Sequence, residues 1–281
     1  MIKKEKVLPF IKNALEEDIQ EGDHSSLACI PNNKVGRAKL LIKENGIIAG
    51  IELAKWIFEY INPSVKVQMH LKDGDSVKKG DIAFTVEGPS TSLLSGERLV
   101  LNCMQRMSAI ATKTNAYVKI LQGTKTTVLD TRKTTPGIRI LEKWAVKIGG
   151  GQNHRFGLYD MIMLKDNHID FAGGIEQAIT KVKNYLKNNK LNLKVEVEAR
   201  NLHEVKEIIA VGGIDRIMLD NFTPEETSEA VKHIDNKYET ESSGGITSKT
   251  IRTYAECGID YISVGALTHS VKNMDLSLKA F

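Results

Sequence analysis

The chain has 281 residues, of which 41% are hydrophobic and 26% are charged, with six prolines. This composition excludes a disordered, collagen-like or low-complexity chain and is typical of one large globular domain or two modest ones. The 39 Lys and Arg residues outnumber the 35 Asp and Glu residues by four, an excess too small to indicate a nucleic-acid or membrane surface.

The three cysteines, Cys29, Cys103 and Cys257, are widely spaced and form no Cys-x-x-Cys pair. Their number and spacing favour neither a disulfide framework nor a structural zinc site, and they fit a reducing cytoplasm. The apolar stretch near the N-terminus is interrupted by Lys12 and then by acids, and no later run approaches about 18 apolar residues. We therefore expect a cytoplasmic protein with no signal peptide and no membrane anchor.

The first third of the chain predicts a mixed α+β unit. Apolar residues within 7–19 follow helical spacing, and residues 53–61 predict a second, short amphipathic helix. Between them, residues 35–48 predict two strands, which a tight hairpin at Asn45 joins to each other.

Residues 65–90 predict β-structure similar to the hairpins of biotinyl and lipoyl carrier domains. A carrier would present an exposed lysine at the next turn, where this chain has the predicted turn Glu87-Gly88-Pro89-Ser90. We therefore interpret the stretch as a structural hairpin. Residues 92–121 then predict a long helix leading from one domain to the next, and an interruption at Ser95-Gly96 stays open.

From about residue 124 onward, short apolar runs alternate with helical segments, which is typical of a parallel sheet. The predicted strands are 127–129, 161–164, 193–197, 217–219, 238–241 and 261–264. The residues that close them are polar or glycine: Asp130, Lys165, Glu198, Asp220, Ser243 and Gly265. In a β/α barrel the carboxyl ends of all strands open onto the face that carries the chemistry.

This region is shorter than the roughly 250 residues that a complete β/α barrel needs. We therefore expect an α/β protein with an open or incomplete, TIM-like β/α barrel and a smaller N-terminal α+β sandwich domain. The predicted boundaries are residues 1–110 for the α+β domain and 111–269 for the barrel. Residues 270–281 are expected to pack back on the first domain.

Cations are concentrated in residues 130–168, mostly near predicted strand ends. Arg132 and Lys133 follow one strand and Lys165 closes the next, so all three should face the mouth of the barrel. His154 and Arg155 follow the run Gly149-Gly150-Gly151, a loop without side-chain bulk that would let a ligand approach backbone amides.

Two further lysines of this segment, Lys143 and Lys147, lie one helical turn apart and are interpreted as solvated surface. Cations gathered in a concave site instead indicate a small ligand with several negative charges, and the arginine fork suits carboxylates and phosphates. Nucleic acid is disfavoured because neither a basic stripe nor interleaved aromatic residues are present.

Glu198 and Asp220 close two neighbouring strands. Two carboxylates at one barrel mouth suit Mg²⁺ held together with substrate oxygens, or hydrogen bonds to ribose hydroxyls, while a role as plain ion-pair partners of the lysines stays open. The glycine-bearing loops 242–247 and 264–269 close the last two units, where β/α barrels commonly bind phosphate through backbone N–H groups.

The chain resembles the quinolinate phosphoribosyltransferase family of type II phosphoribosyltransferases along nearly its whole length. The motifs that carry the resemblance are EDIQEGDHSS (17–26), GERLVLNCMQRMSAIAT (96–112), DTRKTTPGIR (130–139), GGGQNHRFGLYDMIMLKDNHI (149–169), VEVEA (195–199), MLDNF (218–222), SSGGIT (242–247) and SVGALTHSV (263–271). The motifs within residues 130–169 are highly specific to this family. A departure is Leu99, where the family usually has threonine.

The resemblance implies that quinolinate and phosphoribosyl pyrophosphate, with Mg²⁺, give nicotinate mononucleotide, pyrophosphate and CO₂ in NAD biosynthesis. It implies catalytic roles for Lys133, Lys165, Glu198 and Asp220, the last two also as Mg²⁺ ligands. Quinolinate would contact Arg98, Arg132, His154, Arg155 and Lys165. Phosphoribosyl pyrophosphate would contact Lys133, Lys165, Asp166, Asn167, Ser243, Gly244, Gly245, Gly265 and His269. It also implies a homodimer in which Arg98 enters the neighbouring subunit's site, with further assembly left open.

Two alternatives remain at this point. One is a barrel that forms a Schiff base through Lys165, as aldolases do, and the other is a nucleotide-binding regulator without catalysis. We see no Ser-His-Asp or Cys-His arrangement that would supply a covalent nucleophile.

Overall fold

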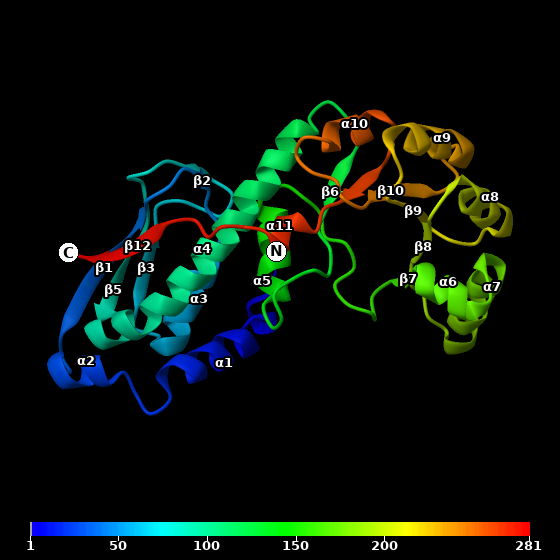
Figure 1. Ribbon diagram of the computed structural model, residues 1–281. Coiled ribbons are helices and arrows are strands. Elements are labelled where there is room, and N and C mark those ends of the chain that lie inside the picture. Colours follow the sequence, from blue (N-terminus) through cyan, green and yellow to red (C-terminus); the bar gives the residue numbers. More distant parts are fainter. Residues whose placement is uncertain (1) are drawn as a thin grey trace. The chain divides into compact units, whose positions relative to one another are not determined.

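The computed structural model describes residues 2–281 and divides the chain into two compact units (Figure 1). Among these residues, the first unit comprises 2–115, 134–150 and 267–281, and the second comprises 116–133 and 151–266. Each unit is therefore built from segments that are separated in the sequence. No helix among the described residues is long and apolar enough to cross a membrane.

The first unit contains a four-stranded antiparallel sheet in the order β12-β1-β5-β3. Its strands are β1 (Val35–Ile42), β3 (Lys66–Met69), β5 (Ile82–Pro89) and β12 (Leu276–Ala280). The chain's last strand pairs with its first, with Leu40 opposite Leu278. Alternate residues of β1, including Ala38, Leu40 and Ile42, are buried, as expected for a strand that packs one face into a core.

The hairpin predicted at Asn45 is wrong. Residues 46–47 form β2 (Gly46–Ile47), but it pairs with β4 (Ser76–Val77), while β1 pairs with β5 and β12. The turn predicted at residues 87–90 is also wrong, because β5 continues to Pro89 and a helix begins at Ser90. Asn-Gly and Gly-Pro dipeptides favour turns locally, but pairing with distant strands decides the outcome in both places.

The helices of the first unit are the 3₁₀ helix η1 (Lys4–Lys6), α1 (Leu8–Ile19), α2 (His24–Cys29), α3 (Ile51–Ile61), most of α4 (Ser90–Ile120), α5 (Arg139–Ile148) and most of α11 (Ala266–His269). The predicted long helix is confirmed and continuous: α4 passes through Gly96 without interruption. A Cβ at Gly96 would lie within 3 Å of the Phe58 and Ile61 side chains, so this glycine allows α3 and α4 to pack closely. Trp56 of α3 stacks on Trp144 of α5, with ring centroids 5.5 Å apart.

The second unit contains a six-stranded parallel sheet in the order β6-β11-β10-β9-β8-β7. Its strands are β6 (Thr127–Leu129), β7 (Ile162–Leu164), β8 (Val195–Ala199), β9 (Arg216–Asp220), β10 (Glu239–Ser243) and β11 (Tyr261–Ser263). All six predicted strands are confirmed, and β6 and β7 remain at opposite edges. The predicted open α/β barrel is therefore the observed fold.

Helices connect these strands: α6 (Asp166–Ala172), α7 (Ile175–Asn189), α8 (Leu202–Val211), α9 (Pro224–Ile234) and α10 (Ile251–Glu256). Neighbouring helices α7, α8 and α9 contact one another in sequence order along the sheet. Because all six strands are parallel, their carboxyl ends lie along one edge of the sheet, where the predicted catalytic residues follow.

Two interpretations of the segment after β6 need correction. Lys143 is not solvated surface: it lies on the buried side of α5 and is only 2% exposed, whereas Lys147 is exposed as expected. Gly149 is also needed for packing. A Cβ there would lie 2.5 Å from the Ala111 carbonyl oxygen of α4, which leaves this glycine no role as an open ligand loop.

Candidate functional site

An ion pair joins the carboxyl ends of two neighbouring strands, β7 and β8. The Lys165 ammonium, directly after β7, lies 2.8 Å from the Glu198 carboxylate of β8. The Glu198 side chain is only 5% exposed, whereas that of Lys165 is 47% exposed. The pair therefore has a fixed, buried anion and a cation that solvent or a ligand can reach.

Asp220 and Ser243 close the next two strands and lie opposite each other in the sheet register. Between these strands the Asn221 N–H donates to the Ser243 carbonyl at 2.9 Å, and the Asn221 amide donates to Asp220 at 2.7 Å. Asn221 and Gly244 approach so closely that a Cβ on Gly244 would collide with the Asn221 side chain. With φ of +96° and +59° at Gly244 and Gly245, this loop needs its glycines.

Two arginines share one region of the second unit. Arg132 is exposed on the segment after β6, and Arg155 is half-buried, with its Nη1 3.4 Å from the Met161 carbonyl oxygen. Burial lowers the pKa of Arg155, and the positive charge of Arg132 lowers it further. Two guanidinium groups that repel each other would be stabilised by an anion with two carboxylates.

The remaining predicted residues divide between the units. In the second unit, Lys133 is exposed, Asp166 and Asn167 form the first turn of α6, and Gly265 follows β11. Arg98 on α4 and His269 at the end of α11 belong to the first unit, and both are exposed.

His154 lies in the barrel interior and has a buried partner. Its side chain is 4% exposed, and its Nε2 lies 2.9 Å from Glu196 of β8 and 3.4 Å from Glu241 of β10. Its backbone N–H donates to Asp130, and its Nδ1 accepts a 2.6 Å hydrogen bond from the Arg155 N–H. Both ring nitrogens are thus occupied by protein groups.

The charge state of this ring is set by opposing effects. Burial acts to lower the pKa of His154, while the carboxylates of Glu196 and Glu241 act to raise it. The bond from Arg155 acts against that rise, since an N–H cannot donate at 2.6 Å to a nitrogen that itself carries a proton. We therefore assign the ring proton to Nε2, facing Glu196.

The carboxylates next to His154 are compensated by Arg216 of β9. Its Nη1 lies 2.8 Å from Glu241, and its guanidinium stacks 4.0 Å above the Tyr261 ring. Burial raises the pKa of Glu196 to about 7, and the nearby Glu241 adds to this rise. Burial also acts to raise the pKa of Glu241, but His154 and Arg216 outweigh it and leave that pKa lowered.

One trio of described residues, His154, Glu196 and Glu241, brings potential metal-ligand atoms within 4.8 Å of one another. The guanidinium of Arg216 already supplies a positive charge there, so we interpret the trio as an internal ion-pair cluster. Glu198 and Asp220 offer carboxylate oxygens at the strand ends instead, and hard oxygen ligands fit Mg²⁺.

Sequence reasoning missed a second buried anchor, Glu142 of α5. Its carboxylate is fully buried and accepts hydrogen bonds from the Arg106 guanidinium and from the Thr135 N–H and hydroxyl. Arg106 also donates to the Thr268 carbonyl at 2.5 Å. The signal available beforehand was an acid on the apolar side of a predicted helix, which indicates a buried partner.

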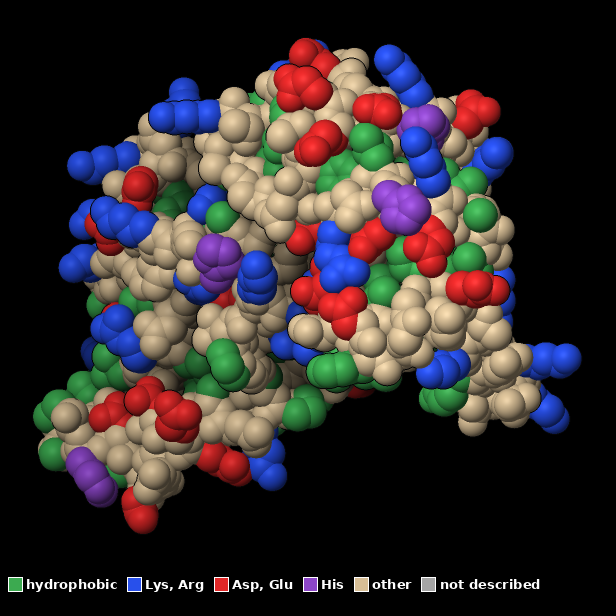
Figure 2. All heavy atoms as spheres, turned by 45° about the vertical axis from the view of Figure 1, so that its right-hand side comes forward, with side chains coloured by type: hydrophobic (Ala, Val, Ile, Leu, Met, Phe, Trp, Pro, Cys, Tyr) green, Lys and Arg blue, Asp and Glu red, His purple; other side chains and the backbone are tan. Residues whose placement is uncertain are grey.

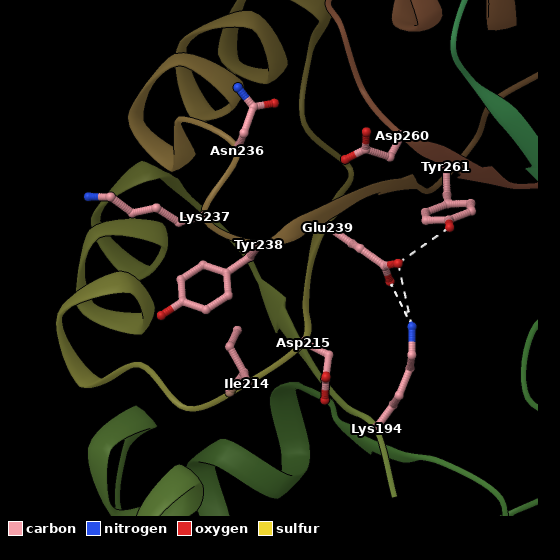
Figure 3. Close-up of a pocket in the computed structure, with 9 residues that line it drawn as sticks. All are labelled: Lys194, Ile214, Asp215, Asn236, Lys237, Tyr238, Glu239, Asp260 and Tyr261. Carbon is pink, nitrogen blue, oxygen red and sulfur yellow. Dashed lines mark hydrogen bonds and ion pairs between the residues drawn. The ribbon is translucent and has the colours of Figure 1, made fainter.

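A cavity of about 530 Å³ opens at the other end of the barrel strands (Figure 3). It is lined by Lys194, Ile214, Asp215, Asn236, Lys237, Tyr238, Glu239, Asp260 and Tyr261, at the amino ends of β8 to β11. Its acids already have protein partners: Glu239 pairs with Lys194 and Arg216, and Asp260 with Lys125. Lys165, Glu198, Asp220 and Ser243 lie at the opposite ends of the strands.

The space-filling view gives the charge distribution over one face of the molecule. Figure 2 shows Lys and Arg side chains intermingled with Asp and Glu across it. This mixture agrees with the small net charge of the chain and is unlike the basic stripe of a nucleic-acid groove binder.

Comparisons with known proteins match both parts of the chain. The family model described as quinolinate phosphoribosyl transferase, N-terminal domain, matches residues 23–108, and that of the C-terminal domain matches residues 110–279. The chain is 46% identical to quinolinate phosphoribosyltransferase (decarboxylating) 1b of Nicotiana tabacum, covering 96% of this chain and 81% of the relative. It is 43% identical to a probable nicotinate-nucleotide pyrophosphorylase (carboxylating) of Bacillus subtilis, covering 93% and 89%.

Solved structures of similar proteins agree with this family assignment. NadC from Streptococcus pyogenes has a TM-score of 0.93 at 39% identity, covering 99% of this chain and 97% of that one. The nicotinate-nucleotide pyrophosphorylase from Francisella tularensis has a TM-score of 0.92 at 37% identity, covering 100% and 98%. At these identities the likeness extends to the family and not to the fold alone.

Proposed function

Because the chain belongs to the quinolinate phosphoribosyltransferase family, we propose that it transfers the phosphoribosyl group of phosphoribosyl pyrophosphate to quinolinate in NAD biosynthesis. The reaction releases pyrophosphate and CO₂ and leaves nicotinate mononucleotide, so the protein is a decarboxylating pentosyltransferase. The observation that carries the proposal is the row of Lys165, Glu198, Asp220 and the Gly244-Gly245 loop at successive strand ends.

The quinolinate end of the site is built on cations. Arg132 and Arg155 supply two guanidinium groups for two carboxylates, and Lys165 lies nearby with a reachable ammonium. A second subunit's Arg98 completes this pocket, which makes the active form a homodimer with shared sites. His154 supports the pocket from the barrel interior, because its ring lies between the Glu196 carboxylate and the backbone N–H of Arg155.

The phosphoribosyl pyrophosphate end uses the glycine-bearing loops. Ser243, Gly244, Gly245 and Gly265 offer backbone N–H groups to the 5′-phosphate, as the last two loops of a β/α barrel commonly do. Lys133, Lys165, Asp166, Asn167 and His269 are the further residues assigned to this substrate.

Glu198 and Asp220 are the proposed Mg²⁺ ligands. Their oxygens fit a hard cation, and Glu198 is held nearly buried by its ion pair with Lys165. Bound magnesium would supply positive charge at the pyrophosphate oxygens.

The protein's own groups then act electrostatically. As the C1–pyrophosphate bond breaks and the quinolinate nitrogen bonds to C1, the carboxylates of Glu198 and Asp220 stabilise the positive charge that develops on the ribose. Loss of CO₂ leaves an electron pair on the ring carbon, which the arginine pocket stabilises until water protonates it. Lys165 serves as an ammonium paired with Glu198, whereas a Schiff base would need its neutral amine.

The test is a pair of assays with phosphoribosyl pyrophosphate and Mg²⁺, one offering quinolinate and the other nicotinate. We expect pyrophosphate and CO₂ from quinolinate alone. Turnover of nicotinate without CO₂ would contradict the dicarboxylate pocket. Borohydride that traps a carbonyl substrate on Lys165 would favour the Schiff-base alternative, and ligand binding without turnover would favour the regulator.

Substitution of one arginine tests the pocket residue by residue. Arg132→Ala should weaken quinolinate binding by about 2–3 kcal/mol, the size of a charge-assisted contact, and should spare phosphoribosyl pyrophosphate. Separate titrations of the two substrates by calorimetry measure this. An equal loss for both substrates would contradict the assignment of Arg132.

A further inference from the structure

The proposed quinolinate pocket is supported by a buried contact between His154 and Glu196, a residue that is assigned no part in binding. Glu196 of β8 is fully buried, and its Oε2 lies 2.9 Å from His154 Nε2. His154 Nδ1 in turn accepts the Arg155 N–H at 2.6 Å. A chain of contacts therefore runs from the barrel interior to an arginine of the pocket.

This chain of contacts fixes the ring of His154 on both sides. Its backbone N–H is held at 2.9 Å by Asp130, which also accepts from Asn153 and is itself fully buried. The ring has no nitrogen left for a substrate, and its side chain is 4% exposed. His154 is therefore placed to act on Arg155 rather than on quinolinate.

We infer that Glu196 is a positioning residue: through His154 it fixes the backbone of Arg155 and so sets the affinity for the second carboxylate of quinolinate. This inference rests on the proposed function for its substrate but not for its geometry. The Glu196 carboxylate keeps the imidazole proton on Nε2 and leaves Nδ1 free to accept from Arg155. Preorganised cations of this kind bind an anion without a cost of reorganisation.

Glu239 provides a matched control. Glu239 is another acid of the same barrel, and it forms an ion pair with Arg216 at 3.0 Å, while Glu241 pairs with Arg216 at 2.8 Å. Glu239 lines the cavity at the amino ends of the strands (Figure 3). No contact joins it to His154 among the described ion pairs. A substitution there perturbs the same ion-pair network without touching the link to Arg155.

Steady-state kinetics test the link. Glu196→Ala should raise the KM for quinolinate by about tenfold or more, with the KM for phosphoribosyl pyrophosphate within about twofold and kcat little changed. Glu196→Gln keeps an acceptor oxygen for Nε2–H and should stay within about threefold of the parent, as should Glu239→Gln in every parameter. Equal rises in both KM values, or a lower melting temperature with unchanged KM, would overturn the inference.

Spectroscopy tests the same link without any substrate. In protein with ¹⁵N-labelled histidine near pH 7.5, the ring of His154 should carry its proton on Nε2 alone, and Glu196→Gln should preserve that state. His154→Asn keeps an acceptor for the Arg155 N–H but cannot reach Glu196, so combined with Glu196→Ala it should add no further loss. A doubly protonated His154, or additive effects in the double variant, would overturn the inference. An inactive parent with the expected tautomer would contradict only the proposed function.

Discussion

Single buried acids organise both units of this protein. Glu142 in the first unit and Glu196 in the second are fully buried: Glu142 accepts hydrogen bonds from Arg106 of α4, and Glu196 lies 2.9 Å from the His154 ring. A carboxylate is kept in such a place only when donors surround it, because an unpaired buried charge is very costly. These residues therefore mark points where several chain segments are held to one another.

We expect Glu142→Ala to lower the free energy of unfolding by about 3 kcal/mol, because it leaves the Arg106 guanidinium and the Thr135 N–H without their acceptor. Denaturant unfolding followed by circular dichroism measures this. Glu17→Ala, at an exposed position of α1, should change stability by less than about 0.5 kcal/mol. Similar values for the two variants would show that Glu142 is not an anchor.

Thiol reactivity should separate the cysteines by burial. Burial raises the pKa of Cys103 to about 12, so at pH 8 almost none of it is the reactive thiolate, while Cys29 is exposed. A disulfide reagent should label Cys29 rapidly and Cys103 only as the pH approaches 12 or after unfolding. The rapid phase should disappear in Cys29→Ser, and rapid labelling of Cys103 in the folded protein would contradict its burial.

Sequence patterns identified the residues at the strand ends but not the buried charged residues within strands and helices. Lys165, Glu198 and Asp220 were found because a polar residue directly after an apolar run is conspicuous. Lys143 was misjudged as surface because its burial depends on what packs against α5, which no local pattern reveals. The role of Glu196 was missed for the same reason, since its partners come from other segments.

At the scale of elements, parallel and antiparallel pairings differed in how far they could be predicted. Each βα unit of the barrel is local in the chain, so its strands follow from alternation and spacing, although the pairing of β6 with β11 does not. The pairing of β1 with β12 joins residues more than two hundred positions apart, and no local turn motif in the sequence predicts it. The prediction of a hairpin at Asn45 failed because it considered only neighbours in sequence.

Packing between helices gives a prediction at this scale. Gly149→Ala should destabilise the protein by about 1–3 kcal/mol, because the new Cβ would meet the Ala111 carbonyl and the Thr114 side chain of α4. Thermal unfolding measures the change. Lys147→Ala, exposed on α5, serves as control and should be near neutral. An unchanged melting temperature in the glycine variant would mean that α4 and α5 adjust without strain.

At the scale of the whole molecule, the proposed site needs residues from two copies of the chain. Arg98→Ala and Glu198→Ala should each be inactive, and a mixture should regain about a quarter of the parent activity, because random exchange makes half of the dimers hybrid and each hybrid has one intact site. Activity after subunit exchange, verified by mass, measures this. No recovery after verified exchange would contradict the shared site.

The pairing of β12 with β1 also orders the events of biosynthesis. Residues 276–280 leave the ribosome after every strand of the barrel, so the sheet of the first unit lacks its outer strand until the whole barrel has been synthesised. The sheet that contains β1 is therefore completed only after the barrel strands have been made. A nascent chain would carry an open edge on β1 throughout translation of the barrel, and that edge is where premature association with other chains should begin.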